Sequence, residues 1–441
     1  MCGHALDLLP EIPDGVIHCV VTSPPYWGLR DYKAPAVVWG GEPGCEHVWG
    51  AELPRAIEGG GNRGVPKEWQ RPSREHHTGG TSGQFCGRCG GWKGQLGLEP
   101  TPELYCQHIV EVCREVKRVL RDDGTFWLNL GDSYASNWGA GAKRNSSWWS
   151  TKSGELEGKG WGEVETAIPP NMWRKHPTIK PKDLVGIPWT VAFALRDDGW
   201  YLRRDVIWEK PNPMPESCRD RPTSAHEYVF LLTKSPRYFY DQDAVREEAE
   251  DRPFSNLKDK PILSYPGQPQ SYSSGRSGFG HNPAGRNARS VWNIPTKPYP
   301  EAHFATFPPE LARRCILTSP TKVCAKCGAG WERVVDRKLI QDGPVRNRGK
   351  IKGGDAEAKS MTMGDKGIIG HYDVKTLGFR PTCDCGKDAA ADKAIILDPF
   401  MGSGTVALVA HENFRHYVGL EINPDYIPLA EKRGLKQEVI F

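Results

Sequence analysis

Short apolar runs that alternate with amphipathic stretches predict an α/β fold for this chain. Val16–Val21 is almost continuously apolar, which is typical of a strand that is buried on both faces of a sheet. Pro102–Leu120 instead carries its apolar residues at helical spacing, and Thr125–Leu130 predicts the next parallel strand. This succession of strands and helices indicates a doubly wound, mostly parallel sheet.

The same alternation continues towards the C-terminus. Helices are predicted at Lys182–Leu195 and from Thr405 onwards, and Asp122-Asp123-Gly124 is expected to end the earlier helix. Further strands are predicted at Trp200–Trp208, His226–Thr233, Ala394–Leu397 and His416–Leu420. The carboxyl ends of parallel strands are the positions at which an open α/β sheet binds its ligands.

One predicted strand ends in the bend Thr22-Ser23-Pro24-Pro25-Tyr26. Two prolines remove two backbone donors and restrict φ, so the bend is stiff and its carbonyl groups point outward. The result is a hydroxyl, free carbonyls and an aromatic ring at a ligand-binding edge of the sheet. This group is suited to accepting hydrogen bonds from an exocyclic amino group while the ring stacks on a flat base.

A second bend, Asp398–Thr405, follows a strand near the C-terminus. Its glycines, Gly402 and Gly404, lack side chains and let the backbone approach a ligand closely. The next predicted strand leads to Glu421, and an acid at that position of such folds binds ribose hydroxyls. The alternative for Glu421 is a surface acid at a strand end.

The two bends resemble the two motifs of a known enzyme family. Ser23-Pro24-Pro25-Tyr26 resembles the catalytic motif of the DNA amino-methyltransferases, which methylate cytosine N4 or adenine N6. Asp398–Thr405 is similar to their S-adenosylmethionine motif, and the order, catalytic motif first, is that of the beta class. The resemblance implies a Rossmann-like methyltransferase sheet with circularly permuted motif order, S-adenosylmethionine as cofactor and double-stranded DNA as partner.

The resemblance also assigns roles to individual residues. The residues implied in catalysis are Ser23, Pro24, Pro25 and Tyr26, and those implied in cofactor binding are Asp398, Phe400, Gly402, Gly404, Thr405 and Glu421. Where the family usually carries Gly-Asp after a strand, this chain has His4, and no strand is predicted before it.

The chemistry expected at the first bend is direct methyl transfer. Hydrogen bonds from the amine to the Ser23 side chain and the Pro24 carbonyl would make its nitrogen more tetrahedral, and Tyr26 would stack on the flipped base. Serine at the first motif position is commoner among the N4-cytosine enzymes, so cytosine N4 is favoured over adenine N6. Carbon-5 methylation is not expected, because the sequence contains no Pro-Cys dipeptide.

Composition narrows the class of protein. The 441 residues suit one catalytic domain with insertions, and a formal charge of +4 permits nucleic-acid binding without arguing for it. No segment reaches the roughly 20 apolar residues of a membrane span, so we expect a cytoplasmic protein with no membrane partner. In that compartment the 13 cysteines are expected to be metal ligands rather than disulfides.

Two groups of cysteines have the spacing of zinc ligands. Pairs of ligands separated by one or two residues, most of them followed by glycine, predict two structural, zinc-ribbon-like sites in insertions of the domain. The expected ligands are Cys45, His47, Cys86 and Cys89 in the first site, and Cys324, Cys327, Cys383 and Cys385 in the second. The alternative is that these thiols merely lie in loops.

The predicted organisation follows from these motifs. A catalytic half (1–34 and 101–245) and a cofactor half (301–322 and 390–441) are separated by a target-recognition segment (246–300) and carry two zinc insertions (35–100 and 323–389). Basic residues and tryptophans in Tyr134–Thr178 suit either a surface that binds nucleic acid or a mobile loop. Asp132 either faces the active site or caps the element that follows it.

Two other classes of function compete with this hypothesis. A protein or RNA methyltransferase could use a similar proline bend, but its cofactor motif usually comes first. A non-catalytic zinc-ribbon DNA-binding protein would explain the cysteine pairs but not the second bend. The sequence leaves open the recognised site, a homodimer, and whether a cognate restriction nuclease forms a restriction–modification pair with this protein.

Overall fold

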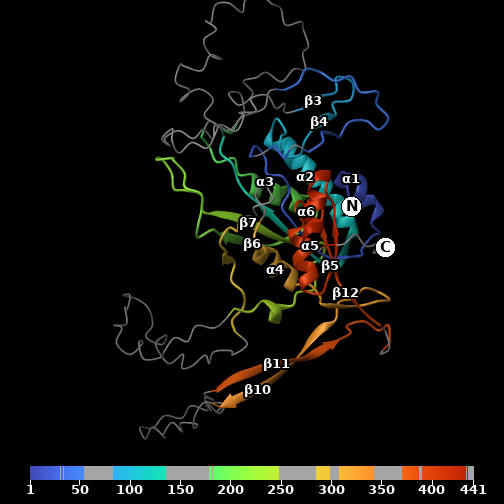
Figure 1. Cartoon of the computed structure of the whole chain (residues 1–441), viewed down its shortest axis with the longest axis vertical. Helices are drawn as coiled ribbons and strands as arrows, with labels where there is room; N and C mark the ends of the chain where they lie inside the picture. The colour runs from blue at the N-terminus through green and yellow to red at the C-terminus, as the bar shows by residue number, and fades with distance from the viewer. Residues whose placement is uncertain are drawn as a thin grey trace, which may run out of the picture. The chain divides into compact units, whose positions relative to one another are not determined.

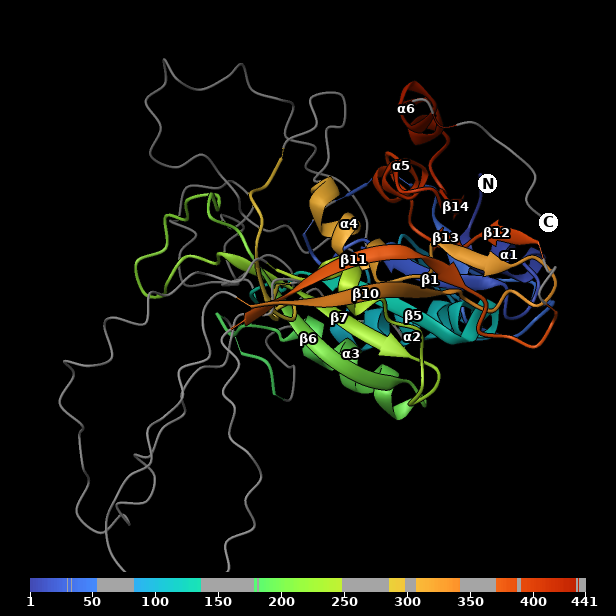
Figure 2. The same ribbon diagram turned by 90° about the horizontal axis from the view of Figure 1, so that it is seen from below.

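The computed structural model divides into two compact units. It describes residues 1–29, 31–32, 34–53, 83–135, 178–180, 182–247, 285–297, 307–341, 370–386, 390–433 and 435. Unit 1 comprises Met1–Phe239, Ser290–Thr321 and Lys393–Phe441, and unit 2 comprises Tyr240–Arg289 and Lys322–Asp392. Figure 1 labels many of the helices and strands of both units, and Figure 2 also labels β1, β13 and β14.

Unit 1 is built on a seven-stranded sheet with the order β14-β13-β1-β5-β7-β6-β8. Its strands are β1 (Ile17–Thr22), β5 (Leu120–Leu130), β6 (Tyr201–Glu209), β7 (His226–Thr233), β8 (Val291–Asn293), β13 (Ile395–Asp398) and β14 (His416–Gly419). β14, β13, β1 and β5 are parallel to one another, β7 is antiparallel to β5 and β6, and β8 is parallel to β6. The predicted α/β class with a mostly parallel sheet is confirmed.

Helices cover both faces of this sheet (Figure 2). The α-helices in the described part of unit 1 are α1 (Ala5–Leu8), α2 (Pro102–Val119), α3 (Ile187–Asp197), α4 (Pro309–Leu317), α5 (Thr405–Glu412) and α6 (Ile427–Lys432). Val20 of β1 belongs to the core that α2 and α3 form on one face, whereas Cys19 and Val21 belong to the core formed with α4 and α5. All six residues of β1 are buried, as the continuous apolar run predicts.

The predicted helices and strands differ from the observed ones mainly at their starts. β5 begins at Leu120, so the predicted turn at Asp122-Asp123-Gly124 is wrong; Leu120 is buried and pairs with Ile17 of β1. The helix predicted from Lys182 begins only at Ile187, after Gly186 with φ of 82°. Most of Tyr134–Thr178, and Arg276 with most of the predicted target-recognition segment, lie outside the described residues.

The two ends of the chain meet in the centre of the sheet. β1 pairs in parallel with β13, with Cys19 opposite Ile396 and Val20 opposite Leu397. At the carboxyl ends of these strands the Thr22 hydroxyl donates a 2.6 Å hydrogen bond to Asp398 Oδ1, and both side chains are buried. The two motif bends therefore leave the same edge of the sheet from neighbouring strands.

The N-terminal segment also pairs with the C-terminal part of the chain. Cys2 forms an isolated parallel bridge with Glu421, in which Gly3 N donates to Glu421 O at 2.9 Å and Glu421 N donates to Met1 O at 3.1 Å. The residues before His4 thus extend the strand pairing beyond β14, although the sequence predicts no strand there.

The first insertion packs on the core of unit 1. β2 (Val37–Trp39), β3 (Gln84–Phe85) and β4 (Trp92–Gly94) form an antiparallel three-stranded sheet. Its buried Trp39 and Trp92 stack on His108 of α2, with ring centroids 4.6 and 5.3 Å from the imidazole. The insertion therefore shares the hydrophobic core that surrounds α2.

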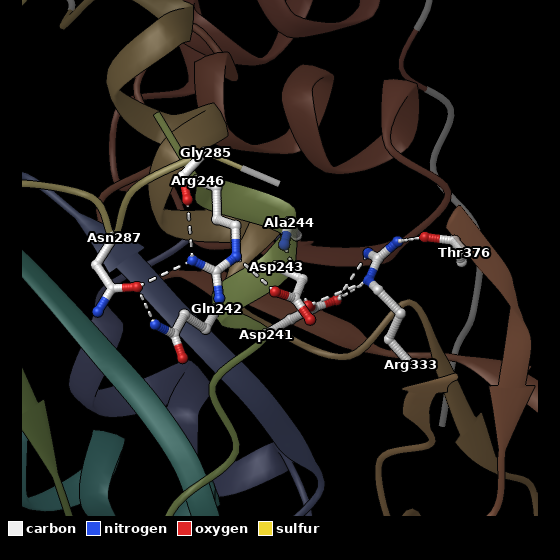
Figure 3. A network of polar contacts seen from close by, with 9 residues as sticks. All are labelled: Asp241, Gln242, Asp243, Ala244, Arg246, Gly285, Asn287, Arg333 and Thr376. Carbon is white, nitrogen blue, oxygen red and sulfur yellow. Dashed lines mark hydrogen bonds and ion pairs between the residues drawn. The ribbon is translucent and has the colours of Figure 1, made fainter. Parts of the chain in front are cut away.

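Unit 2 joins two segments that are separated along the chain. β10 (Glu332–Gln341) and β11 (Gly370–Arg380) form an antiparallel pair, and β9 (Lys322–Cys324) pairs with β12 (Ala391–Lys393). Arg333 of β10 donates to both carboxylate oxygens of Asp241, at distances down to 2.7 Å, as Figure 3 shows. Arg246 continues this network through Asp243 and Asn287. These contacts connect the segment after Tyr240 to the pair of strands β10 and β11.

None of the helices in the described ranges combines the length and the apolarity that a membrane span requires.

The contact between β1 and β13 can be tested by replacing Thr22 with valine. Thr22→Val removes the donor to the buried Asp398 carboxyl, and we expect the free energy of unfolding to fall by about 1–3 kcal/mol. Urea unfolding monitored by tryptophan fluorescence measures this change. Thr22→Ser keeps the hydroxyl and serves as the control; equal losses in both variants would contradict the assigned hydrogen bond.

Candidate active site and metal centres

The predicted catalytic bend lies at the carboxyl end of β1, and its backbone is held by neighbouring residues. Tyr105 Oη of α2 donates to the Pro25 carbonyl at 3.0 Å, and Trp27 Nε1 donates to the Glu99 carbonyl at 2.9 Å. Within the described part of the chain, no group donates to the Pro24 carbonyl. The bend is therefore anchored through Pro25 and Trp27, and the carbonyl predicted to bind the amine is left for a ligand.

The loop that contains Gly97 and Glu99 supports this bend, although it was not predicted from the sequence. Gly97 has φ of +89°, and a Cβ at this position would lie 3.1 Å from Tyr26 O and 3.2 Å from Pro25. The buried Glu99 carboxylate accepts from Gly97 N at 2.8 Å and contacts His108 Nδ1 at 2.9 Å. Burial raises the pKa of Glu99, while its contact with His108 acts in the opposite direction. Only glycine allows the loop to approach the bend this closely.

Tyr26 is held through both its hydroxyl and its ring. Its Oη donates to Glu227 Oε2 at 2.6 Å and accepts from Asn129 Nδ2 at 2.6 Å. The ring packs against Gly131, where a Cβ would lie 2.7 Å from Tyr26 Cε2. Burial, followed by the charge of Glu227, raises the pKa of Tyr26, so the phenol stays protonated at neutral pH. Glu227 and Asn129 were not predicted from the sequence.

The predicted cofactor bend is organised by its two acids. Asp398 Oδ1 accepts from Thr22 Oγ1 and, at 3.0 Å, from Phe400 N. Burial raises the pKa of Asp398 to about 7, although the hydrogen bond from Thr22 acts against this shift. Glu421 accepts from Gly402 N at 2.7 Å and from Asn423 N at 2.8 Å. Asp398 therefore stabilises the start of the bend, and Glu421 connects the bend to the segment that follows β14.

The two glycines of this bend have different surroundings. Both have positive φ, +54° at Gly402 and +79° at Gly404. A Cβ at Gly404 would lie 2.9 Å from Ala430 and Leu435, whereas a Cβ at Gly402 would meet nothing within 4 Å. Gly404 therefore allows close packing of the chain after β14, and Gly402 borders open space.

The residues around the bend fit S-adenosylmethionine. The buried Ser403 hydroxyl has no hydrogen-bond partner among the residues that the structure describes. With the Glu421 carboxylate and the open space at Gly402, it offers polar groups of the kind that bind hydroxyl and ammonium groups of such a ligand. Thr405 begins α5 directly after Gly404, so its position in the bend matches the predicted motif.

Asp132 is a helix cap in the structure. Its Oδ1 accepts from Gly186 N at 3.0 Å and from Ile187 N at 3.1 Å, at the first turn of α3. Of the two alternatives that the sequence left open, the structure supports the cap. The start of α3 at Ile187 could have decided between the two alternatives, but it lies far from Asp132 in the sequence.

The arginines of the predicted target-recognition segment that the structure describes are engaged in unit 2. Arg286 Nε and Arg289 Nε donate to the same Glu247 oxygen, at 3.1 and 2.7 Å. Glu247 and Arg286 also form an antiparallel bridge. These contacts bring the two ends of the segment together, and its role in recognising DNA stays a prediction.

Both predicted groups of zinc ligands come together in the structure. In each group one ligand atom per residue lies within 4.8 Å of the others, for Cys45, His47, Cys86 and Cys89, and for Cys324, Cys327, Cys383 and Cys385. Zinc binds sulfur at about 2.3 Å and nitrogen at about 2.0 Å, so each donor set fits one tetrahedral ion. Four protein ligands leave no position open for chemistry, which is typical of a structural site.

The bend at Gly402 and Gly404 predicts two separable effects of alanine. Both substitutions share the strain of positive φ, but only Gly404→Ala also creates a clash, so we expect the larger loss in thermal stability there. Gly402→Ala should weaken S-adenosylmethionine binding, and it should lower the melting temperature less than Gly404→Ala does. Thermal melting and calorimetric titration measure the two effects, and equal melting temperatures for the two variants would contradict the packing described here.

Purified protein is expected to contain two zinc ions per chain, one for each ligand group. Cys86→Ser and Cys324→Ser should each lower the zinc content by one ion, as measured by elemental mass spectrometry. Cys218→Ser is the control, because this exposed cysteine lies outside both groups and should leave the content unchanged. Full zinc occupancy in both ligand variants, or absence of zinc from the unmodified protein, would rule these sites out.

Comparison with known proteins identifies the family. A family model described as DNA methylase matches residues 17–323 and 387–432. The chain is 33% identical over 435 residues to Type II methyltransferase M.XycI of Xanthomonas campestris pv. cyanopsidis, covering 98% of this chain and 85% of the relative. Type II methyltransferase M.Cfr9I of Citrobacter freundii is 32% identical with the same coverage. M.SmaI of Serratia marcescens is 31% identical, covering 99% of this chain and 90% of the relative. The chain therefore belongs to the N6/N4 DNA methylase family and is an S-adenosylmethionine-dependent DNA amino-methyltransferase.

Proposed function

We propose that this enzyme methylates the N4 amine of cytosine within a specific site of double-stranded DNA. The observation that supports Ser23 as the acceptor for the amine is the orientation of its hydroxyl, which donates to Tyr26 Oη at 3.1 Å. Because its hydrogen points to Tyr26, its lone pairs are available to accept from an amino group. These acceptors suit the amine of either base, so the choice of cytosine N4 rests on the serine at this motif position, which is commoner among the N4-cytosine enzymes.

In this proposal the catalytic bend activates the amine. Ser23 Oγ and the Pro24 carbonyl accept the two N–H groups, which makes the nitrogen more tetrahedral and directs its lone pair towards the methyl donor. When bound, S-adenosylmethionine would supply the methyl group from its sulfonium; the C–S bond breaks as the N–C bond forms, and the methylated amine releases its surplus proton to water. Much of the rate acceleration then comes from orientation, because two stiff backbone bends hold both reactants.

The cofactor bend takes the complementary task. Gly402 borders the space for the ligand, Glu421 accepts hydrogen bonds from ribose hydroxyls, and Asp398 keeps the bend beside the end of β1. Phe400, Gly404 and Thr405 shape the bend and the start of α5. The parallel pairing of β1 with β13 supports a common site for both reactants.

Base flipping follows from the chemistry of the substrate. The exocyclic amine of a paired base is engaged in the duplex, so the base must leave the stack before it reaches Ser23 and Pro24. Tyr26 is the proposed stacking partner, since Gly131 packs against its ring and the hydroxyl is held by Glu227. The names of the relatives, Type II methyltransferases, support a role in restriction–modification; a homodimer and a partner nuclease remain predictions.

The target base is tested by analysing the product. DNA treated with the enzyme and S-adenosylmethionine should contain N4-methylcytosine, detected by mass spectrometry of its nucleosides. Ser23→Ala should lower the rate of methyl transfer by about 10²–10³-fold, because one preorganised acceptor is lost. N6-methyladenine as the sole product would overturn the proposed base and leave the family assignment intact, since the same acceptors can bind either amine.

A further inference from the structure

A polar cluster lies directly behind the proposed catalytic bend. Glu227 of β7 accepts from Tyr26 Oη at 2.6 Å and from Asn129 Nδ2 at 3.0 Å through the same oxygen. Its other carboxylate oxygen forms an ion pair with Lys210 Nζ. Only 15% of the Glu227 side chain and 20% of the Lys210 side chain are exposed, so water weakens these contacts little. Asn129 and Glu227 lie in β5 and β7, Lys210 follows β6, and Tyr26 follows β1, so the cluster draws on four successive strands of the sheet.

The hydrogen bonds of the cluster have a single direction. Ser23 Oγ donates to Tyr26 Oη, and Tyr26 Oη donates to Glu227, so the chain ends at a carboxylate that can only accept. Asn129 Nδ2 donates to both Tyr26 and Glu227, which prevents the phenol from turning away. The orientation of the Ser23 hydroxyl is therefore determined by the Glu227 carboxylate, which lies two hydrogen bonds away through Tyr26.

We propose that Glu227 is a positioning residue for methyl transfer, which acts through Tyr26 to keep the lone pairs of Ser23 directed at the substrate amine. This inference rests on the proposed function, because it takes Ser23 as the acceptor. If the acid were neutral, its proton could be donated to Tyr26, and Ser23 could then turn its own hydrogen towards the amine.

The charge of Glu227 also suits the electrostatics of the reaction. The amine nitrogen becomes more positive as it forms a bond to the methyl carbon. A carboxylate at the end of a hydrogen-bond chain increases the electron density on each oxygen of that chain, so Ser23 Oγ becomes a better acceptor in the transition state. Lys210 holds the Glu227 carboxylate in place through the ion pair, without contacting the bend in any described interaction.

The decisive variant is Glu227→Gln, which keeps the shape of the side chain and removes its charge. We expect kcat for DNA methylation to fall about tenfold or more, with little change in KM for S-adenosylmethionine or in its binding by calorimetry. Tyr26→Phe interrupts the chain, so Glu227→Gln should cause no further loss in a Tyr26→Phe background. Glu209→Gln, on the neighbouring strand β6, is the matched control and should leave kcat unchanged.

A second variant separates this mechanism from a purely structural ion pair. Lys210→Gln breaks the same ion pair but leaves the carboxylate bonded to Tyr26, so it should retain more activity than Glu227→Gln. Equal losses in these two variants, or additive losses of Glu227→Gln and Tyr26→Phe, would overturn the inference. Full activity of Ser23→Ala would instead overturn the proposed function on which it rests.

Discussion

The parallel pairing of β1 with β13 is the contact on which the proposed active site depends. It brings together two motifs from opposite ends of the chain, and the Thr22–Asp398 hydrogen bond joins the two strands at their carboxyl ends. Both partners of that bond are buried, and buried polar groups are normally hydrogen-bonded. A different pairing of the two strands would leave both groups buried without a partner. A methyltransferase with its catalytic motif first and its cofactor motif last requires such a contact, because neither bend alone holds both reactants.

The first insertion contributes to the support of the proposed catalytic bend. Tyr105 of α2 donates a hydrogen bond to the Pro25 carbonyl, and His108 of the same helix contacts Glu99 and stacks with two tryptophans of the first insertion. The predicted zinc ligands of that insertion are thus close in the fold to the residues that support the bend.

The sequence predicted the fold where the pattern is local. β1 and α2 were placed to within one or two residues, because burial on both faces and helical periodicity are visible over a few residues. Glu227 and Asn129 could not be assigned, since their partner Tyr26 lies about 100 to 200 residues away and strand patterns do not specify such contacts. Asp132 was ambiguous for the same reason: its partners are 54 and 55 residues further along.

The central claim is that both bends form one site. Its most direct test is an experimental structure with S-adenosylhomocysteine bound. The account predicts that the ligand lies along Gly402 and Glu421, with its sulfur turned towards Ser23 and the Pro24 carbonyl, so that a methyl group would point between the two acceptors. A ligand bound away from this bend, or with its sulfur turned away from Ser23, would contradict the account.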